Sequence, residues 1–205
     1  ETDELGGKDP YSASKACAEI LINSYILSFL NSSNSMKVST ARSGNVIGGG
    51  DYSKERLVPD ILRAFNENKL LTIRNPDHVR PWQHVIEPIF GYLILAEKQY
   101  LNKISKLDHS WNFGPKKDSF VTVKQLINKF KNQKIINRCL IKKNRNIETK
   151  ILKLNSSKAI KYLKWKQKWN IDQTLKKIIE WNTSTRKEKN FRKMCENQIT
   201  EYLKD

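Results

Sequence analysis

The 205-residue sequence predicts an α/β fold, because segments with helical periodicity alternate with short apolar strands. A packed helix is expected over residues 14–30, where apolar residues recur at helical spacing. A strand over residues 37–41 then runs directly into the glycine-rich stretch 42–51. Glycine permits close backbone approach, and open α/β sheets bind ligands where their strands end. We therefore predict a binding loop at 42–51, with a flexible turn as the alternative.

The later elements continue this alternation, and particular residues mark their boundaries. Pro59 suits the first turn of a helix, Thr122 a helix cap, and the pair Gly114-Pro115 the end of a strand. The predicted elements are, in order, a helix at 59–68, a strand at 70–73, a helix at 87–101, a strand at 111–115, a helix at 123–130, a strand at 148–154, a helix at 157–163 and a helix at 171–181. Beyond Thr183 the chain is highly charged, which indicates an extended helix or a disordered tail.

The charge of the chain is divided unevenly. Residues 1–115 hold 13 Lys or Arg and 13 Asp or Glu, so residues 116–205, with 25 and 8, carry the whole net charge of +17. A basic region of this kind raises the possibility of binding to nucleic acid or to an anionic membrane. The lysines, however, are spread among asparagines and isoleucines and form no dense run. We therefore expect a solvated basic surface or a small polyanionic partner instead.

Neither the cysteines nor the histidines indicate a metal site, because their spacings match no ligand pattern. They are Cys17, Cys139, Cys195, His78, His84 and His109. The cysteines are interpreted as reduced thiols of a cytosolic protein. No apolar run reaches the ~18 residues that a membrane span requires, and the amino end does not resemble a signal peptide. These observations predict a soluble, cytoplasmic protein.

Tyr11 and Lys15 are the first candidates for chemistry. Residues four apart share one face of a helix, so the Lys15 ammonium can favour the phenolate form of Tyr11. A phenolate at this position could act as a general base. The spacing alone also arises on solvated helix faces, but Pro10 at the helix start and the small residues between the pair favour a defined site.

Three arginines in neighbouring loops are the second group of candidates, namely Arg56, Arg74 and Arg80. The guanidinium fork matches the geometry of a phosphate group. Trp82 follows in the same proline-broken segment and could contact a flat ring. Together with the glycine-rich strand end, these residues indicate a site for a ligand that carries both a phosphate and a ring.

Six segments of the sequence resemble one family of enzymes. They are GGKDPYSASKACAE at 6–19, ARSGNVIGGGD at 41–51, RLVPDILRA at 56–64, IRNPDHVRPWQHVIEP at 73–88, WNFGP at 111–115 and SKAIKYLKW at 157–165. These segments resemble the extended short-chain dehydrogenases/reductases, and within them the nucleotide-sugar 4,6-dehydratases. The resemblance implies a partial Rossmann-type sheet and a smaller carboxy-terminal α/β subdomain that binds the substrate.

The resemblance also implies a division of the chain. Residues 1–48 would be a remnant of the NAD-binding domain, and residues 49–182 mainly the nucleotide-sugar-binding subdomain. Residues 79–115 would return to the Rossmann sheet, and residues 183–205 would form the charged tail. The family pairs through the helix that bears its tyrosine, so a homo-oligomer is expected.

The resemblance implies an NAD-dependent dehydration. Tyr11 would remove the proton of the sugar 4-hydroxyl while a hydride leaves carbon 4, and Lys15 would support Tyr11 and contact the nicotinamide ribose. Water would then leave from carbon 6, to which the hydride returns. The segment RPWQHV departs from the dTDP-glucose relatives, so we expect CDP-glucose as substrate and CDP-4-dehydro-6-deoxyglucose as product. The remaining implied contacts are Ser43 near the nicotinamide, Asn45 at the diphosphate and sugar, and Arg56, Arg74, Arg80 and Asn112 at the nucleotide and phosphates.

One departure from the family pattern concerns the amino end. Only ten residues precede Tyr11, whereas the glycine-rich dinucleotide fingerprint of the family lies more than about 100 residues before its tyrosine. We therefore expect a carboxy-terminal fragment that is inactive alone and poorly soluble through its exposed strand edges. The alternatives are a noncatalytic nucleotide-sugar-binding protein whose basic region holds an acidic partner, and a related epimerase or decarboxylase.

Overall fold

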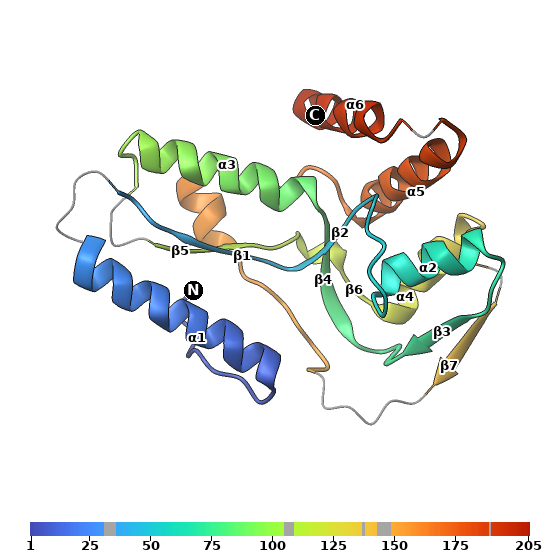
Figure 1. The fold of residues 1–205 in the computed structure, drawn as a ribbon, viewed down its shortest axis with the longest axis horizontal. Helices are drawn as coiled ribbons and strands as arrows, with labels where there is room; N and C mark the ends of the chain where they lie inside the picture. Colours follow the sequence, from blue (N-terminus) through green and yellow to red (C-terminus); the bar gives the residue numbers. More distant parts are fainter. Residues whose placement is uncertain (31–35, 105–108, 137, 143–148, 189) are drawn as a thin grey trace. The chain divides into compact units, whose positions relative to one another are not determined.

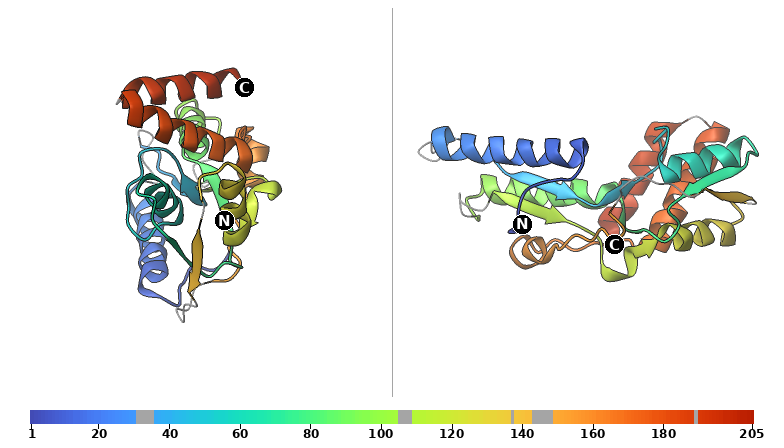
Figure 2. Two further views of the ribbon diagram at one scale, coloured as in Figure 1. Left: turned by 90° about the vertical axis from the view of Figure 1, so that its right-hand side faces the viewer. Right: turned by 90° about the horizontal axis from the view of Figure 1, so that it is seen from below.

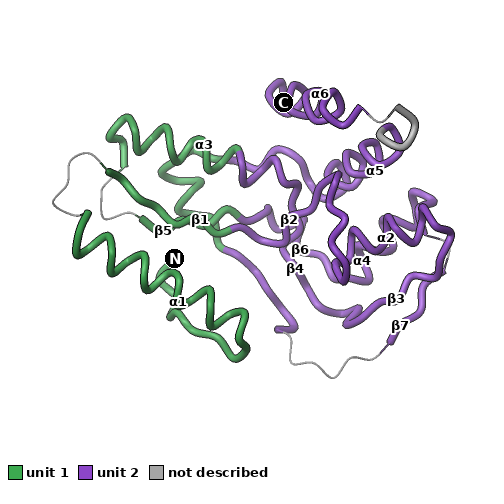
Figure 3. Tube along the Cα trace, in the orientation of Figure 1, with its two compact units in different colours: residues 1–42, 90–113, 155–165 green, residues 43–89, 114–154, 166–205 purple. Residues whose placement is uncertain are grey.

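The computed structural model consists of two compact units, coloured green and purple in Figure 3. Unit 1 comprises residues 1–42, 90–113 and 155–165, and unit 2 comprises residues 43–89, 114–154 and 166–205. The structure describes residues 1–30, 36–104, 109–136, 138–142, 149–188 and 190–205. The alternation of helices and strands confirms the predicted α/β class (Figure 1).

Unit 1 pairs two strands and contains the first helix of the chain. Its elements, two of which cross into unit 2, are α1 (Pro10–Tyr25), the π-helical turn η1 (Ile26–Leu30), β1 (Thr40–Ser43), α3 (Ile86–Tyr100), β5 (Ser110–Phe113) and the π-helical turn η3 (Ala159–Leu163). Strands β1 and β5 form a two-stranded sheet. Phe113 of β5 meets the rings of Tyr92 and Trp165 edge-on, with 5.3 Å between ring centroids in both pairs. These aromatic contacts lie at the centre of a small hydrophobic core.

Unit 2 holds two further sheets. Its elements are β2 (Asn45–Ile47), α2 (Leu57–Asn66), β3 (Leu71–Arg74), β4 (Val79–His84), η2 (Lys117–Ser119), β6 (Phe120–Thr122), α4 (Val123–Asn132), β7 (Cys139–Lys142), α5 (Ile171–Glu188) and α6 (Phe191–Lys204). Strand β4 lies between a parallel partner, β2, and an antiparallel partner, β6. Strands β3 and β7 pair in parallel. Helices α5 and α6 pack together (Figure 2).

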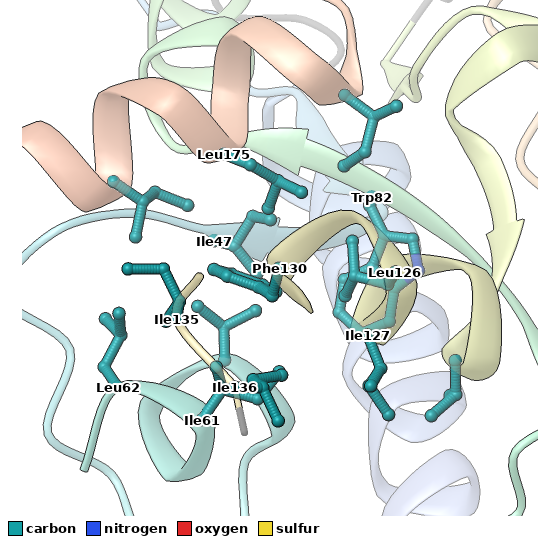
Figure 4. Packing of buried hydrophobic residues seen from close by; sticks show 14 of the residues in the cluster. Ile47, Ile61, Leu62, Trp82, Leu126, Ile127, Phe130, Ile135, Ile136 and Leu175 are labelled. Carbon is teal, nitrogen blue, oxygen red and sulfur yellow. The ribbon is translucent and has the colours of Figure 1, made fainter. Parts of the chain in front are cut away.

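The core of unit 2 is built from the apolar faces of α2, α4 and α5 (Figure 4). Ile61, Leu126, Phe130 and Leu175 are all fully buried in it. Burying one such side chain stabilises a fold by roughly 1.5 to 3 kcal/mol. This cluster gives unit 2 a hydrophobic core of its own.

Helix starts follow from their capping residues. The Asp9 carboxylate accepts hydrogen bonds from the backbone N–H groups of Tyr11 and Ser12, both at 3.0 Å, and Pro10 occupies the first turn. The predicted Thr122 cap is confirmed. Its hydroxyl accepts from the N–H of Gln125 at 3.0 Å, whose side chain in turn accepts from the Thr122 N–H at 2.7 Å.

Several elements differ from the sequence-based expectation. The strand predicted at 148–154 is reduced, within the described residues, to a single bridge between Val79 and Ile151. The segment beyond Thr183 is helical, because α5 extends to Glu188 and α6 follows. Strand β4 was missed because four of its residues are buried irrespective of polarity, which removes the apolar-polar alternation of a half-buried strand.

Candidate functional site

In unit 1, helix α1 places Tyr11 and Lys15 on one exposed face. The Tyr11 side chain lies in the first turn and is 71% exposed. The Lys15 Nζ atom lies 5.5 Å from the centre of the Tyr11 ring. The predicted proximity of ammonium and phenol is therefore present, and both groups are accessible to a ligand.

An ion pair joins α1 to β1 one helical turn beyond Lys15. Arg42 donates through Nε and Nη2 to the two carboxylate oxygens of Glu19, at 2.7 and 2.8 Å. The Thr40 hydroxyl donates to the same carboxylate at 2.9 Å. The hydrogen bond from Arg42 is the largest cause that holds the pKa of Glu19 below its usual value. This bidentate pair fixes the helix that carries Tyr11 against the strand that ends at Ser43.

Asn112 is also engaged inside unit 1. It is buried in β5, its Oδ1 accepts from Arg42 Nη1 at 3.4 Å, and its backbone N–H donates to the Glu1 carboxylate at 3.0 Å. Glu19 and Arg42 were not among the predicted site residues. Glu19 could have been found from its position, because it lies four residues after Lys15 and therefore on the same helix face as Tyr11 and Lys15.

In unit 2, the glycine-rich loop packs on a tryptophan. A Cβ atom at Gly49 would lie 2.3 Å from the Trp181 ring of α5, so no side chain fits there. Gly50 has a φ of +80°, which favours glycine, and a Cβ on Gly44 would lie 2.6 Å from the Pro81 carbonyl oxygen. Asn45 opens β2 opposite Trp82. The glycines therefore allow neighbouring segments of unit 2 to pack closely together. Ligand binding by the loop stays a prediction.

Two of the predicted arginines are exposed at the ends of elements of unit 2. Arg56 occupies the position before the first turn of α2. The pKa of Asp51 lies below its usual value, mainly through hydrogen bonds from Ser53 and also through the charge of Arg56. Arg74 ends β3, with its Nη2 3.9 Å from the carboxylate of Glu55. Both guanidinium groups present donors to solvent, as an anion-binding site requires.

Arg80 is placed differently, because its guanidinium is engaged with its own chain. Nη1 donates to the carbonyl oxygens of Val79 at 2.9 Å and Thr149 at 2.8 Å. Nη2 lies 3.0 Å from Nδ1 of His78. These contacts tie β4 to the segment that follows the undescribed residues 143–148. Arg80 thus helps to hold β4 in place, whatever it contacts in a ligand.

A cluster of buried polar side chains surrounds Glu87, which follows β4 in the chain, and it was not predicted from the sequence. Glu87 is fully buried in the first turn of α3 and accepts from the Trp169 N–H at 2.8 Å and the Tyr202 hydroxyl at 2.7 Å. His84 packs edge-on against Trp169, with ring centroids 5.0 Å apart. Burial, followed by the charge of Lys177, lowers the pKa of His84 to about 4.

The predicted residues therefore fall into two groups, which belong to different units. Unit 1 holds Tyr11, Lys15 and Asn112, and unit 2 holds Ser43, Asn45, Arg56, Arg74 and Arg80. In the described part of the chain, no group of three or more His, Cys, Asp or Glu residues is arranged to hold a metal ion. None of the described helices is long and apolar enough to cross a membrane.

Comparison with known sequences gives one family and several relatives. Residues 1–178 match the model of the GDP-mannose 4,6 dehydratase family. The chain is 37% identical to CDP-glucose 4,6-dehydratase of Salmonella typhimurium, over 99% of the chain and 58% of that enzyme. It is 25% identical to a trifunctional UDP-glucose 4,6-dehydratase of Arabidopsis thaliana, over 89% of the chain and 26% of that protein. The chain thus spans little more than half of the Salmonella relative.

Solved structures agree on the fold. The dTDP-glucose 4,6-dehydratase of Bacillus anthracis, solved in complex with NAD, superimposes with a TM-score of 0.76. The match covers 95% of this chain and 58% of that one at 19% sequence identity. At this identity the likeness shows the fold alone, and the chain corresponds to little more than half of that structure.

Proposed function

Because the chain belongs to the GDP-mannose 4,6-dehydratase family, we propose that it carries the catalytic helix and the nucleotide-sugar-binding part of a CDP-glucose 4,6-dehydratase. The proposed product is CDP-4-dehydro-6-deoxyglucose. The observation that carries the proposal is the 37% identity to the Salmonella enzyme over 99% of the chain. The cytidine of the substrate is proposed because that relative is a CDP-glucose enzyme.

Tyr11 is the proposed general base. It takes the proton of the sugar 4-hydroxyl as carbon 4 is oxidised, because a phenolate within hydrogen-bond reach of a hydroxyl accepts its proton. Lys15, whose Nζ atom lies 5.5 Å from the ring centre, is the proposed cationic partner of Tyr11. Glu19 and Arg42 have an indirect role, because their ion pair fixes the helix that carries Tyr11 and Lys15.

Arg56 and Arg74 are the proposed contacts of the diphosphate. A nucleoside diphosphate sugar carries about two negative charges, and a guanidinium binds such oxygens with two parallel hydrogen bonds. Both side chains are exposed in unit 2: Arg56 ends the segment between β2 and α2, and Arg74 lies 3.9 Å from Glu55 of that segment. Asn45 and Arg80 in unit 2 and Asn112 in unit 1 complete the proposed set of substrate residues.

The same residues fit NAD as the cofactor. Tyr11 and Lys15 are exposed on one face of α1, as contacts to a nicotinamide ribose require, and Ser43 lies at the end of β1. Tyr11 and Lys15 would hold the ribose, and Ser43 would lie against the nicotinamide. Bound NAD supplies reversible acceptance of a hydride. The contribution of this chain is the orientation of the ribose and the proton transfer at Tyr11.

Assembly and location extend the proposal. Ile20, Leu21 and Tyr25 of α1 are large apolar side chains that face solvent. Such a surface supports pairing of two copies through this helix in the intact enzyme.

Cys17, Cys139 and Cys195 are free thiols, which supports a cytoplasmic location.

The test is enzymatic and uses a chimera. The amino-terminal part of the Salmonella enzyme is placed before residue 1, and the complete Salmonella enzyme serves as positive control. We expect the chimera to convert CDP-glucose to the 4-keto product with NAD, and the present chain alone to form none. A chimera that binds CDP yet forms no 4-keto product would contradict the dehydratase proposal and favour a noncatalytic binding protein.

A further inference from the structure

The carboxyl-terminal helix α6 reaches the most deeply buried carboxylate of unit 2. Glu87 has no exposed surface. Burying a charged group costs several kcal/mol unless hydrogen bonds and partners compensate for the lost water. Three donors do so here, namely the backbone N–H groups of Lys168 and Trp169 and the hydroxyl of Tyr202. Two of the donors thus precede α5, and the third comes from α6.

Glu87 thereby joins two parts of the predicted binding surface. It lies three residues after His84, where β4 ends, and β4 pairs with the strand that Asn45 opens. The backbone that it binds leads into α5, and Trp181 of α5 supports the loop at Gly49. The position of one carboxylate is therefore linked to the strand and to the loop on which the predicted substrate contacts depend.

Helix α6 is fastened at several points around this carboxylate. The Tyr202 side chain is almost fully buried, and its ring lies 5.2 Å from that of Trp169 at nearly a right angle. Trp169 Nε1 donates to the Asp205 carboxylate at 2.8 Å, and Lys168 Nζ donates to the Tyr202 carbonyl oxygen at 2.7 Å. One turn earlier, the Gln198 amide donates to the carbonyl oxygen of Lys177 at 2.8 Å. These contacts hold the Tyr202 hydroxyl in a fixed position.

We propose that α6 positions the nucleotide-binding surface of unit 2, and that Tyr202 is the positioning residue through which it acts on Glu87. Removal of the hydroxyl leaves one carboxylate oxygen short of its shortest hydrogen bond, 2.7 Å. The buried carboxylate then moves or protonates, and β4 and the segment before α5 lose their common anchor. The identity of the ligand rests on the function proposed above, whereas the positioning itself does not.

The electrostatics of the cluster supply a readout that packing alone would not give. Burial raises the pKa of Glu87, while the hydrogen bonds from Trp169, Tyr202 and Lys168 and the charge of Lys116 oppose that rise. The titratable or charged residues that face the cluster are His84, Lys116, Lys168, Lys177, Tyr202 and Asp205. Without the Tyr202 hydroxyl the pKa of Glu87 rises further.

The sign of the effect follows from linkage. When the pKa of a carboxyl group is raised in the folded state, the free energy of unfolding falls as the pH rises through that pKa. Tyr202→Phe should therefore destabilise the chain more at neutral pH than at acid pH. The contribution of His84 is common to wild type and variant, so it cancels in their difference.

The experiment compares Tyr202→Phe with Tyr100→Phe in the full chain, because Tyr100 is 84% exposed and serves as matched control. Urea unfolding is followed at about pH 5 and about pH 7.5, with Glu87→Gln as background for a double-mutant cycle. We expect Tyr202→Phe to raise the unfolding constant by more than about tenfold at the higher pH and by clearly less at the lower. In the Glu87→Gln background this pH difference should vanish.

Positioning is measured separately by amide hydrogen exchange and by titration with CDP. We expect faster exchange in β2 and the segment 48–51, and about fivefold weaker CDP binding, in Tyr202→Phe but not in Tyr100→Phe. Equal destabilisation at both pH values, or unchanged exchange in these segments, would overturn the proposal. If wild type does not bind CDP, the proposed function fails, and the exchange and pH results still decide the role of Tyr202.

Discussion

The two units differ in how their key side chains are held. In unit 1 the candidate acid-base pair stands on an exposed helix that is fixed by a half-buried ion pair between Glu19 and Arg42. In unit 2 the segments that carry the substrate candidates lie over a hydrophobic core and around a buried carboxylate, Glu87. The proposed acid-base pair of unit 1 is thus exposed, whereas the proposed substrate residues of unit 2 lie on segments packed over a larger core. Substitutions should separate these two roles.

The sharpest separation is expected at Tyr11. In the chimera, Tyr11→Phe should lower kcat for CDP-glucose by about 100-fold to 10,000-fold, the usual contribution of a general base. Thermal unfolding should hardly change, because the side chain is 71% exposed. The matched control is Tyr100→Phe, an exposed tyrosine of α3. A large loss of stability in Tyr11→Phe would show a structural role instead.

The opposite pattern is expected in the core of unit 2. Phe130→Ala removes a fully buried ring of α4 and should lower the free energy of unfolding by about 3 to 5 kcal/mol. Leu93→Ala in the part of α3 that belongs to unit 1 is the control, because Leu93 is exposed, and it should change this free energy by less than about 0.5 kcal/mol. If urea denaturation gave equal losses of unfolding free energy for Phe130→Ala and its control, the proposed difference in burial between the two sites would be contradicted.

A pH dependence is expected from His84. Its pKa is lowered to about 4 in the folded chain, so the folded state binds fewer protons than the unfolded state between that value and the ordinary one, 6.5. Stability is then fully present above the ordinary pKa and falls, by up to about 3 kcal/mol, as the pH drops through this window. His84→Gln should remove this fall in pH-dependent unfolding curves. An unchanged curve would show that other groups cause the acid sensitivity.

The smallest effect is expected at the ion pair of unit 1. Glu19→Gln keeps the shape of the side chain and removes its charge, and it should cost about 1 kcal/mol, since the pair is partly exposed and screened by salt. The cost should shrink at high salt in equilibrium unfolding experiments. Lys69, which pairs with Glu67 on the surface, provides the control variant Lys69→Gln with a smaller loss. A salt-independent cost would indicate packing and not charge.

The sequence predicted most where the physical cause is local. Thr122 was recognisable as a cap because its partner Gln125 lies in the next turn, and the Tyr11 and Lys15 pair because helical geometry relates residues four apart. The cluster at Glu87 was not recognisable, because its partner Tyr202 is 115 residues away. No local pattern reports such a contact.

The same reasoning applies to the surroundings of the proposed site residues. Arg56 and Arg74 are exposed, as a phosphate contact requires. Arg80 and Asn112 hold other parts of the chain as well, which depends on tertiary packing and not on their motifs. Gly49 and Gly50 lie against Trp181, which follows more than a hundred residues later, so no local pattern reports that contact.

The central claim of the proposed function is that unit 2 binds a cytidine nucleotide. Isothermal titration of the chain with CDP, UDP and dTDP tests it most directly. Arg56→Gln is the test variant, and Arg192→Gln, an exposed arginine of α6, is its control. The account predicts that CDP binds most tightly and that only Arg56→Gln weakens it, by about tenfold. Equal binding of the three nucleotides, or CDP binding that does not depend on Arg56, would contradict it.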